Sequence, residues 1–283
     1  MHQRNRENQV ESKLRRLHTT EHAEADSSDP SVPEAPARRR GIYLLPNLFT
    51  TAALFAGFYA IIASMRGSYT AAAVAIFIAM VLDGLDGRVA RLTGTASSFG
   101  AQYDSLSDLV SFGIAPALLI YHYALLDLVA YGPVWGKIGW LVAFFYAGAT
   151  ALRLARFNAR SGTQGKRWFL GLPSPAAAGT IAGLVWLAWT LDISAAALVI
   201  PAVALTIFIG AMMMSNLAYY SFKEFKLDRR LAVTSALAIP LIFICIAVSP
   251  PGVLFGVFFL YALSAPVWWL VRLDRRRRRR GAH

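Results

Sequence analysis

The chain has 283 residues, of which 56% are hydrophobic and only 16% charged, and its formal net charge is +12. Its mean hydropathy is +0.47. This composition excludes one or two soluble domains for most of the chain and predicts a polytopic membrane protein. The single cysteine, Cys245, excludes a disulfide framework and a cysteine-rich zinc site.

Residues 1–40 are polar, lack hydrophobic periodicity and contain no apolar core of a signal peptide. We expect them to form a disordered cytoplasmic tail. The tail ends in three arginines at 38–40, which are suited to contact with anionic membrane lipids. A solvated tail that only signals topology is the alternative.

Eight apolar runs follow, each long enough to cross about 30 Å of hydrocarbon as a helix. They cover residues 46–65, 69–90, 99–125, 134–154, 172–191, 195–214, 231–248 and 251–271. A Ser-Pro-Pro-Gly turn at 249–252 separates the last two runs. The sequence therefore predicts an all-α transmembrane bundle of eight spans.

The positions of the basic residues support eight spans whose connecting loops alternate between the two sides of the membrane. With the N-terminus inside, 26 of the 28 Lys and Arg fall on the inner side, and only Arg66 and Lys137 fall outside. By the positive-inside rule both termini are cytoplasmic, as in a bacterial-type inner or cell membrane. Topology thus explains the net charge, and no nucleic acid partner is expected. The arginines at 275–280 are expected to orient the chain and to contact anionic lipids.

Four aspartates lie in or beside apolar segments, near the predicted cytoplasmic face. Asp83 and Asp86 are three residues apart, and Asp104 and Asp108 are four apart, so each pair projects from one face of its helix. A charge near the bilayer centre costs roughly 2.5–3.5 kcal/mol. If the two helices are neighbours, the carboxylates converge and need cations between them. Ligation by oxygen alone favours Mg²⁺ or Mn²⁺, so we predict a divalent metal centre at the membrane surface.

The aspartates form part of a longer pattern over residues 83–108, DGLDGRVARLTGTASSFGAQYDSLSD. Its fixed positions are Asp83, Asp86, Gly87, Ala90, Arg91, Gly100, Asp104 and Asp108. The pattern resembles the signature of the CDP-alcohol phosphotransferases at every fixed position. Within that family the chain is most similar to the branch that uses serine. That similarity is carried by LPNLFT (45–50), SFGAQYDSLSDLVSFGIAP (98–116), RLARFN (153–158) and FLGLPSPAAA (169–178).

The resemblance implies a reaction and an architecture. The phosphatidyl group of CDP-diacylglycerol would pass to L-serine with release of CMP, assisted by two Mg²⁺ or Mn²⁺ ions. The family has a six-helix core and forms homodimers, so we expect a transmembrane core at 41–225. Two additional helices at 226–272 and a basic cytoplasmic tail at 273–283 would extend it.

The resemblance also assigns roles to residues. Asp83, Asp86, Asp104 and Asp108 would hold the metal ions, and Asp108 would also be the general base for the serine hydroxyl. CDP-diacylglycerol would be bound by Pro46, Asn47, Thr50, Asp83, Gly87, Arg91 and Ser97. Arg153, Arg156 and Asn158 would bind the carboxylate of serine or the lipid phosphate.

The residues leave two alternatives open. The acceptor alcohol could be glycerol 3-phosphate, inositol, inositol phosphate or choline, because Arg153 and Arg156 suit a phosphate as well as a carboxylate. A divalent-cation transporter could also use an aspartate cluster. It would need a polar path to the outer face, and AAAVAIFIAMV at 71–81 and VSFGIAPALLIY at 110–121 offer little of one.

Overall fold

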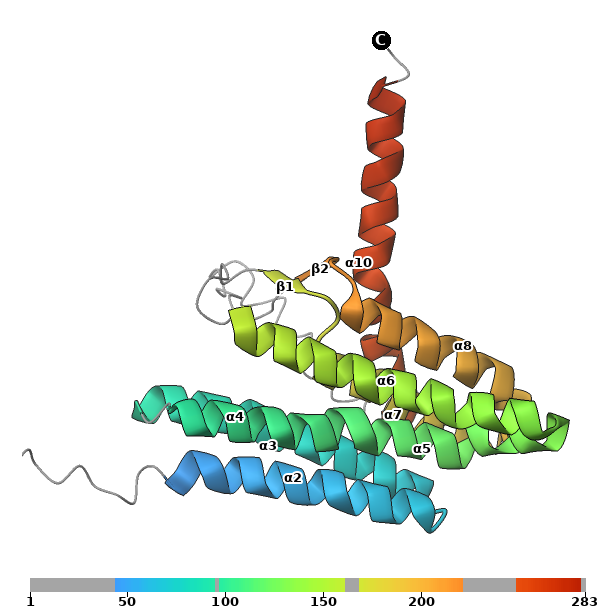
Figure 1. Ribbon diagram of the computed structural model, residues 1–283, viewed down its shortest axis with the longest axis horizontal. Coiled ribbons are helices and arrows are strands. Elements are labelled where there is room, and N and C mark those ends of the chain that lie inside the picture. The colour runs from blue at the N-terminus through green and yellow to red at the C-terminus, as the bar shows by residue number, and fades with distance from the viewer. Residues whose placement is uncertain (1–43, 95–96, 161–167, 221–247, 281–283) are drawn as a thin grey trace, which may run out of the picture. The chain divides into compact units, whose positions relative to one another are not determined.

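The computed structural model describes residues 44–94, 97–160, 168–220 and 248–280 (Figure 1). The chain divides between Arg40 and Gly41, and all of the described residues belong to the second unit. The predicted disordered tail at 1–40 lies outside the described residues. So does the predicted seventh span at 231–248, except for Val248.

Most of the described chain is helical. The helices are α2 (Leu44–Met65), α3 (Tyr69–Thr93), α4 (Ser98–Asp108), α5 (Ala115–Tyr123), α6 (Pro133–Arg160), α7 (Ser174–Thr190), α8 (Ala195–Met214) and α10 (Pro250–Arg280). A π-helical turn, η2 (Leu109–Ile114), joins α4 to α5, and a 3₁₀ segment, η3 (Leu125–Tyr131), precedes α6. Two short strands, β1 (Trp168–Leu170) and β2 (Ala218–Tyr220), follow α6 and α8.

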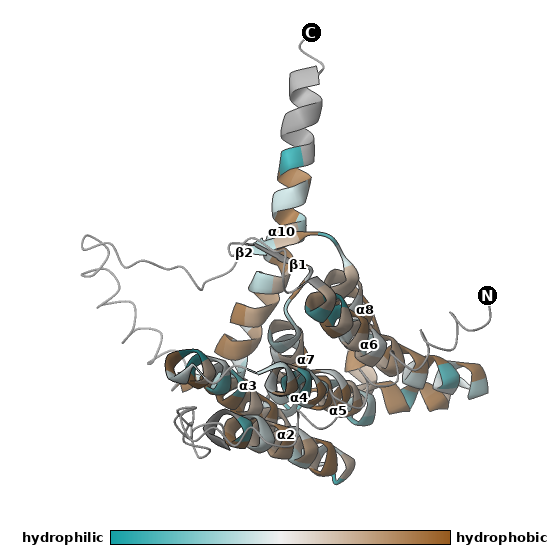
Figure 2. Cartoon of the chain, turned by 60° about the vertical axis from the view of Figure 1, so that its left-hand side comes forward, coloured by the Kyte–Doolittle hydropathy of each residue, from teal (hydrophilic) through white to brown (hydrophobic). Residues whose placement is uncertain are grey.

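Six helical segments of the described chain are long and apolar enough to cross a membrane. They are Asn47–Met65, Tyr69–Thr93, Ser98–Tyr123, Pro133–Ala159, Ala195–Met214 and Pro250–Arg272. Each agrees within a few residues with a predicted span, and Figure 2 shows apolar colouring along much of these helices. The prediction of a polytopic helical bundle is therefore confirmed. The count of eight spans and the cytoplasmic location of both termini stay predictions.

Helix α7 is the centre of the bundle. It has 17 residues, fewer than the predicted span of 172–191, and is buried along most of its length. It packs against α3, α5, α8 and α10. Small residues make this possible: a Cβ at Gly179 would lie 2.7 Å from the Phe258 ring of α10, and one at Gly183 would lie 2.9 Å from the Phe255 backbone. Close helix packing through small residues is typical of membrane bundles.

A two-stranded antiparallel sheet departs from the all-α prediction. β1 pairs with β2 in a register that places Trp168 opposite Tyr220 and Leu170 opposite Ala218. The backbone N–H of Leu172 also donates to the Met212 carbonyl at 3.0 Å. The pairing satisfies backbone groups and ties the chain entering α7 to the chain leaving α8.

The π turn η2 is fixed on two sides. The Ser111 hydroxyl donates to the Ala53 carbonyl of α2 at 3.1 Å, and the buried Tyr146 hydroxyl of α6 donates to the Phe112 carbonyl at 3.0 Å. A π turn adds a residue to a helix, which rotates the side chains before it relative to those after it. The orientation of Asp104 and Asp108 is therefore set separately from the apolar face of α5.

Candidate metal centre

Three aspartates from two helices meet in the bundle. Asp83 of α3 and Asp104 and Asp108 of α4 each offer a carboxylate oxygen, and these oxygens lie within 4.8 Å of one another. All three side chains are half-buried. Asp83 lies within hydrogen-bonding distance of both Asp104 and Asp108. The structure therefore brings together residues that are up to 25 positions apart in the sequence.

The cluster fits a hard divalent cation. Oxygens around one octahedral Mg²⁺ are roughly 3–4 Å apart, so carboxylates within 4.8 Å need only a small shift to share an ion. Asp104 Oδ1 is buried and has no hydrogen-bond partner among the described residues. Arg153 attracts Asp108 electrostatically, but one guanidinium cannot balance three carboxylates. An ion between the carboxylates would supply the missing charge and the missing partner of Oδ1.

Asp86 is the predicted ligand that the structure places differently. Its Oδ2 accepts a hydrogen bond of 2.7 Å from the Thr50 hydroxyl of α2, and the side chain is buried. It lies close enough to Asp104 for their charges to interact but is not one of the three clustered residues. The hydrogen bond from Thr50 orients Asp86 beside the cluster, so its role as a ligand stays a prediction.

Hydrogen bonds with α2 and α6 hold helix α4 in place. The Ser107 hydroxyl donates to the Thr50 carbonyl at 3.1 Å, and the hydroxyls of Thr51 and Tyr103 share a hydrogen bond of 2.9 Å. From α6, Asn158 Nδ2 donates to Ser105 Oγ at 2.9 Å. These contacts flank Asp104 and Asp108 on the chain and fix the direction of their side chains.

The residues predicted to bind the nucleotide lie around the starts of α2 and α4 and in the second half of α3. Pro46 falls in the first turn of α2, because that helix begins at Leu44. Ser97 is the N-cap of α4 and accepts from the Gly100 N–H at 3.0 Å, and Arg91 is exposed in the last turn of α3.

Two further residues of this predicted group lie close to these. The Asn47 carbonyl accepts from the Thr51 hydroxyl at 2.7 Å, and its side-chain oxygen lies near Gly100 of α4. A Cβ added at Gly87 would meet no atom within 4 Å, so the packing of the described chain does not require a glycine there. Roles in nucleotide binding stay predictions for all seven of the residues named for it: Pro46, Asn47, Thr50, Asp83, Gly87, Arg91 and Ser97.

Arg153 faces the carboxylate cluster. Its side chain is only 8% exposed, and its Nη1 donates to Ser174 Oγ, at the start of α7, at 2.9 Å. Its Nε is buried and has no hydrogen-bond partner among the described residues. A buried guanidinium with an unused donor beside Asp108 is suited to an anionic ligand.

Arg156 has a different environment, although it lies one turn further along α6. Its Nη1 and Nη2 donate to the carbonyl oxygens of Leu170, Met213, Met214 and Ser215 and to Asn216 Oδ1, at 3.2–3.4 Å. The last carbonyls of a helix have no partner within the helix. Arg156 therefore caps the end of α8 and holds it against β1.

Three residues around Arg153 were not predicted. Ser174 belongs to the GLPSP segment that carries the resemblance, but nothing in its spacing marked it as the partner of Arg153. Tyr146 of α6 and Tyr261 of α10 both lie near this guanidinium. Aromatic residues on apolar helices give no such signal, since they are equally common as packing residues. Through Tyr261, α10 reaches the surroundings of the site.

Comparison with known proteins agrees with this geometry. A family model described as CDP-alcohol phosphatidyltransferase matches residues 43–215, the range that holds all four aspartates. The chain is 33% identical over 232 residues to the CDP-diacylglycerol–serine O-phosphatidyltransferase of Helicobacter pylori (strain J99), covering 82% of this chain and 94% of that protein.

Two further relatives match shorter stretches. The protein of the same name from Mycobacterium bovis is 42% identical over 157 residues, covering 53% of this chain and 52% of that protein. The archaetidylserine synthase of Methanothermobacter thermautotrophicus is 36% identical over 177 residues, covering 62% and 69%.

Proposed function

Because the chain belongs to the CDP-alcohol phosphatidyltransferase family, we propose that it transfers the phosphatidyl group of CDP-diacylglycerol to L-serine and releases CMP. The names of its relatives support this reaction. The observation that carries it is the meeting of Asp83, Asp104 and Asp108 beside the buried Arg153. This arrangement offers ligands for cations, a base and an anion partner within one site.

In the proposed reaction the serine hydroxyl attacks the phosphorus that bears diacylglycerol. A bond forms between the serine oxygen and this phosphorus, and the bond to the phosphate of CMP breaks. Asp108 accepts the hydroxyl proton as the new bond forms. Divalent ions held by Asp83, Asp104 and Asp108, with Asp86 beside them, would neutralise pyrophosphate charge and stabilise the leaving CMP. By resemblance there are two such ions, Mg²⁺ or Mn²⁺.

Arg153 is the better candidate for the carboxylate of serine. It lies next to Asp108, so an acceptor bound to it would present its hydroxyl to the base. The terminal nitrogens of Arg156 already donate to backbone carbonyls and Asn216, and Asn158 donates to Ser105. We therefore assign the acceptor to Arg153 and a supporting role to Arg156 and Asn158.

Exchanging the two arginines for glutamine separates these roles. Arg153→Gln is expected to raise the KM for serine roughly 10- to 100-fold, the value of a hydrogen-bonded charge, and to change the KM for CDP-diacylglycerol much less. Arg156→Gln, the matched control one helical turn away, is expected to lower the unfolding temperature and to leave the ratio of the two KM values unchanged. Steady-state CMP release and thermal unfolding measure both effects.

Arg153→Lys provides a second check, since it keeps the charge and loses the planar donor array. It should recover part of the affinity for serine. If Arg156→Gln instead raises the KM for serine and Arg153→Gln does not, the two assignments are reversed.

Gly87 is proposed to leave space for the nucleotide, because no protein atom fills the position of its Cβ. Gly87→Ala should leave the unfolding temperature unchanged or slightly higher, since alanine is favoured over glycine by about 1 kcal/mol within helices. A methyl group against a bound nucleotide costs about 1–3 kcal/mol, so the KM for CDP-diacylglycerol should rise roughly 5- to 150-fold.

Gly84→Ala is the matched control on the same helix, because a Cβ there also meets no atom within 4 Å and Gly84 is not a fixed position of the pattern. Its KM for CDP-diacylglycerol should equal that of the unsubstituted protein. Equal KM values for Gly84→Ala and Gly87→Ala would remove Gly87 from the nucleotide site.

The acceptor itself is tested with purified protein, CDP-diacylglycerol, Mn²⁺ or Mg²⁺ and a panel of hydroxyl compounds. CMP release should require L-serine. Release with glycerol 3-phosphate or inositol, but not with serine, would retain the reaction class and replace the acceptor. No release with any alcohol would contradict the enzymatic proposal.

We also propose where the active site lies in the membrane and that the protein is a homodimer. The distribution of basic residues supports an active site at the cytoplasmic face of a bacterial-type membrane. The six apolar helical segments of the described chain support the membrane location itself. The family resemblance is the basis for proposing a homodimer.

A further inference from the structure

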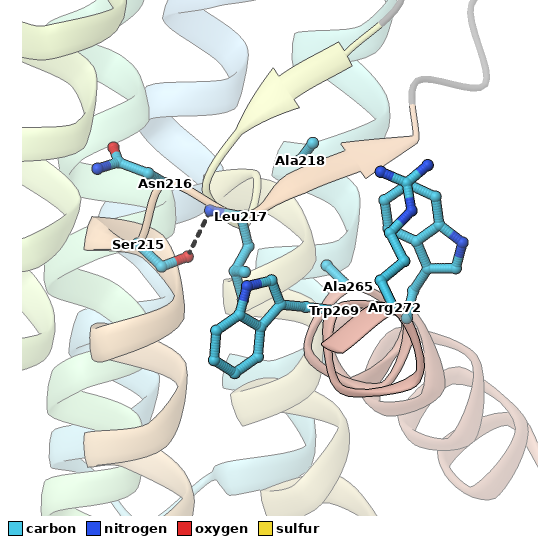
Figure 3. A pocket seen from close by; sticks show the side chains of 8 residues that line it. Ser215, Asn216, Leu217, Ala218, Ala265, Trp269 and Arg272 are labelled. Carbon is cyan, nitrogen blue, oxygen red and sulfur yellow. Dashed lines mark hydrogen bonds between the residues drawn. The ribbon is translucent and has the colours of Figure 1, made fainter. Parts of the chain in front are cut away.

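A groove outside the carboxylate site lies between α10 and the segment that leaves α8. One wall is the face of α10 that includes Ala265, Trp269 and Arg272, and the other is the connection at 215–217 together with Ala218, the first residue of β2 (Figure 3). Its volume is about 440 Å³. The small side chains of Ala218 and Ala265 leave this space open between the larger residues around them.

One part of the groove lining is apolar and another part is cationic. In Figure 3 the side chains of Leu217 and Trp269 lie beside each other, while Arg272 extends toward β2. The guanidinium of Arg272 stacks 3.4 Å from the centroid of the Trp268 ring. Stacking uses one face of the guanidinium and leaves its N–H donors at the edge, where they suit a phosphate ester.

Both walls lie where a membrane-spanning segment ends. The apolar segment of α10 ends at Arg272, and that of α8 ends at Met214, immediately before the groove-lining Ser215. Trp268 and Trp269 are 42% and 49% exposed, as expected for indoles at a membrane–water interface. Six consecutive arginines follow at 275–280 and would draw anionic lipids to this region.

We propose that this groove binds an anionic glycerophospholipid of the surrounding membrane, with its phosphate at Arg272 and its upper acyl chains along Leu217 and Trp269. A lipid fits better than free phosphate, because the lining has one cationic side chain and several apolar ones. The proposal depends on membrane location and not on transfer of a phosphatidyl group to serine, so the two can fail separately.

The test uses the full-length protein in nanodiscs of phosphatidylcholine. Tryptophan fluorescence is recorded as acyl-brominated phosphatidylglycerol, or acyl-brominated phosphatidylcholine, replaces part of the lipid. We expect quenching at a lower mole fraction of the anionic lipid. Trp269→Phe should reduce this selective part of the quenching, leaving the share of the groove-lining Trp268, and Trp135→Phe, which changes an exposed indole in the first turn of α6, should retain all of it.

Arg272→Gln should raise the mole fraction for half-maximal selective quenching about fivefold, the value of one basic residue near an anionic surface. Arg278→Gln removes the same charge from the arginine run and is expected to change it much less. Equal shifts in the two variants would show general attraction by the tail and overturn the site. So would equal quenching by both lipids, or displacement of the selective quenching by inorganic phosphate.

Discussion

Replacing Asp108 with asparagine is expected to lower kcat for CMP release roughly 10²- to 10⁴-fold, the usual contribution of a general base. Asparagine has nearly the same shape but cannot accept a proton from the serine hydroxyl. Because Asp83 and Asp104 remain in place, binding of CDP-diacylglycerol should be largely retained. Single-turnover CMP release and equilibrium binding of the liponucleotide measure the two effects separately.

Asp127→Asn is the matched control for this substitution, since Asp127 lies in η3 and outside the cluster. Its kcat should equal that of the unsubstituted protein. Near-normal turnover by Asp108→Asn would reject the base role. Loss of liponucleotide binding together with turnover would indicate instead that Asp108 acts mainly as a ligand.

Removal of divalent ions is also expected to have a large effect on CMP release. Thorough chelation with EDTA should reduce CMP release to background, and Mg²⁺ or Mn²⁺ should restore it while Zn²⁺ should not. Three clustered carboxylates cannot all remain ionised without a cation, and an oxygen-only site favours hard ions. Activity that survives chelation would exclude the metal centre.

Direct binding of Mn²⁺, followed by electron paramagnetic resonance, tests the same centre without turnover. Asp83→Asn and Asp104→Asn should each weaken Mn²⁺ binding by more than 100-fold, because each removes a clustered carboxylate. If Asp86 only supports the cluster, Asp86→Asn should weaken it roughly 10- to 100-fold, as substitutions behind a metal ligand do. An effect as large as that of Asp83→Asn would make Asp86 a ligand.

The sequence by itself determined the apolar helical segments of the described chain, and it predicted an aspartate-rich site for divalent cations. Helix periodicity placed each aspartate pair on one face, and the alternating distribution of basic residues predicted antiparallel helices. Six of the predicted spans agree with apolar helical segments of the described chain. They could be predicted because the length of an apolar run is read directly from consecutive residues. The RLARFN segment pointed to Arg153 and Arg156 but could not distinguish them.

Only the tertiary structure decided which of these side chains meet. Asp86 accepts a hydrogen bond from Thr50 and lies beside the other three aspartates, and Arg153 faces Asp108 while Arg156 caps α8. Spacing along a helix fixes the face on which a side chain lies, but not which neighbouring helix covers that face. That choice depends on packing between segments far apart in the sequence.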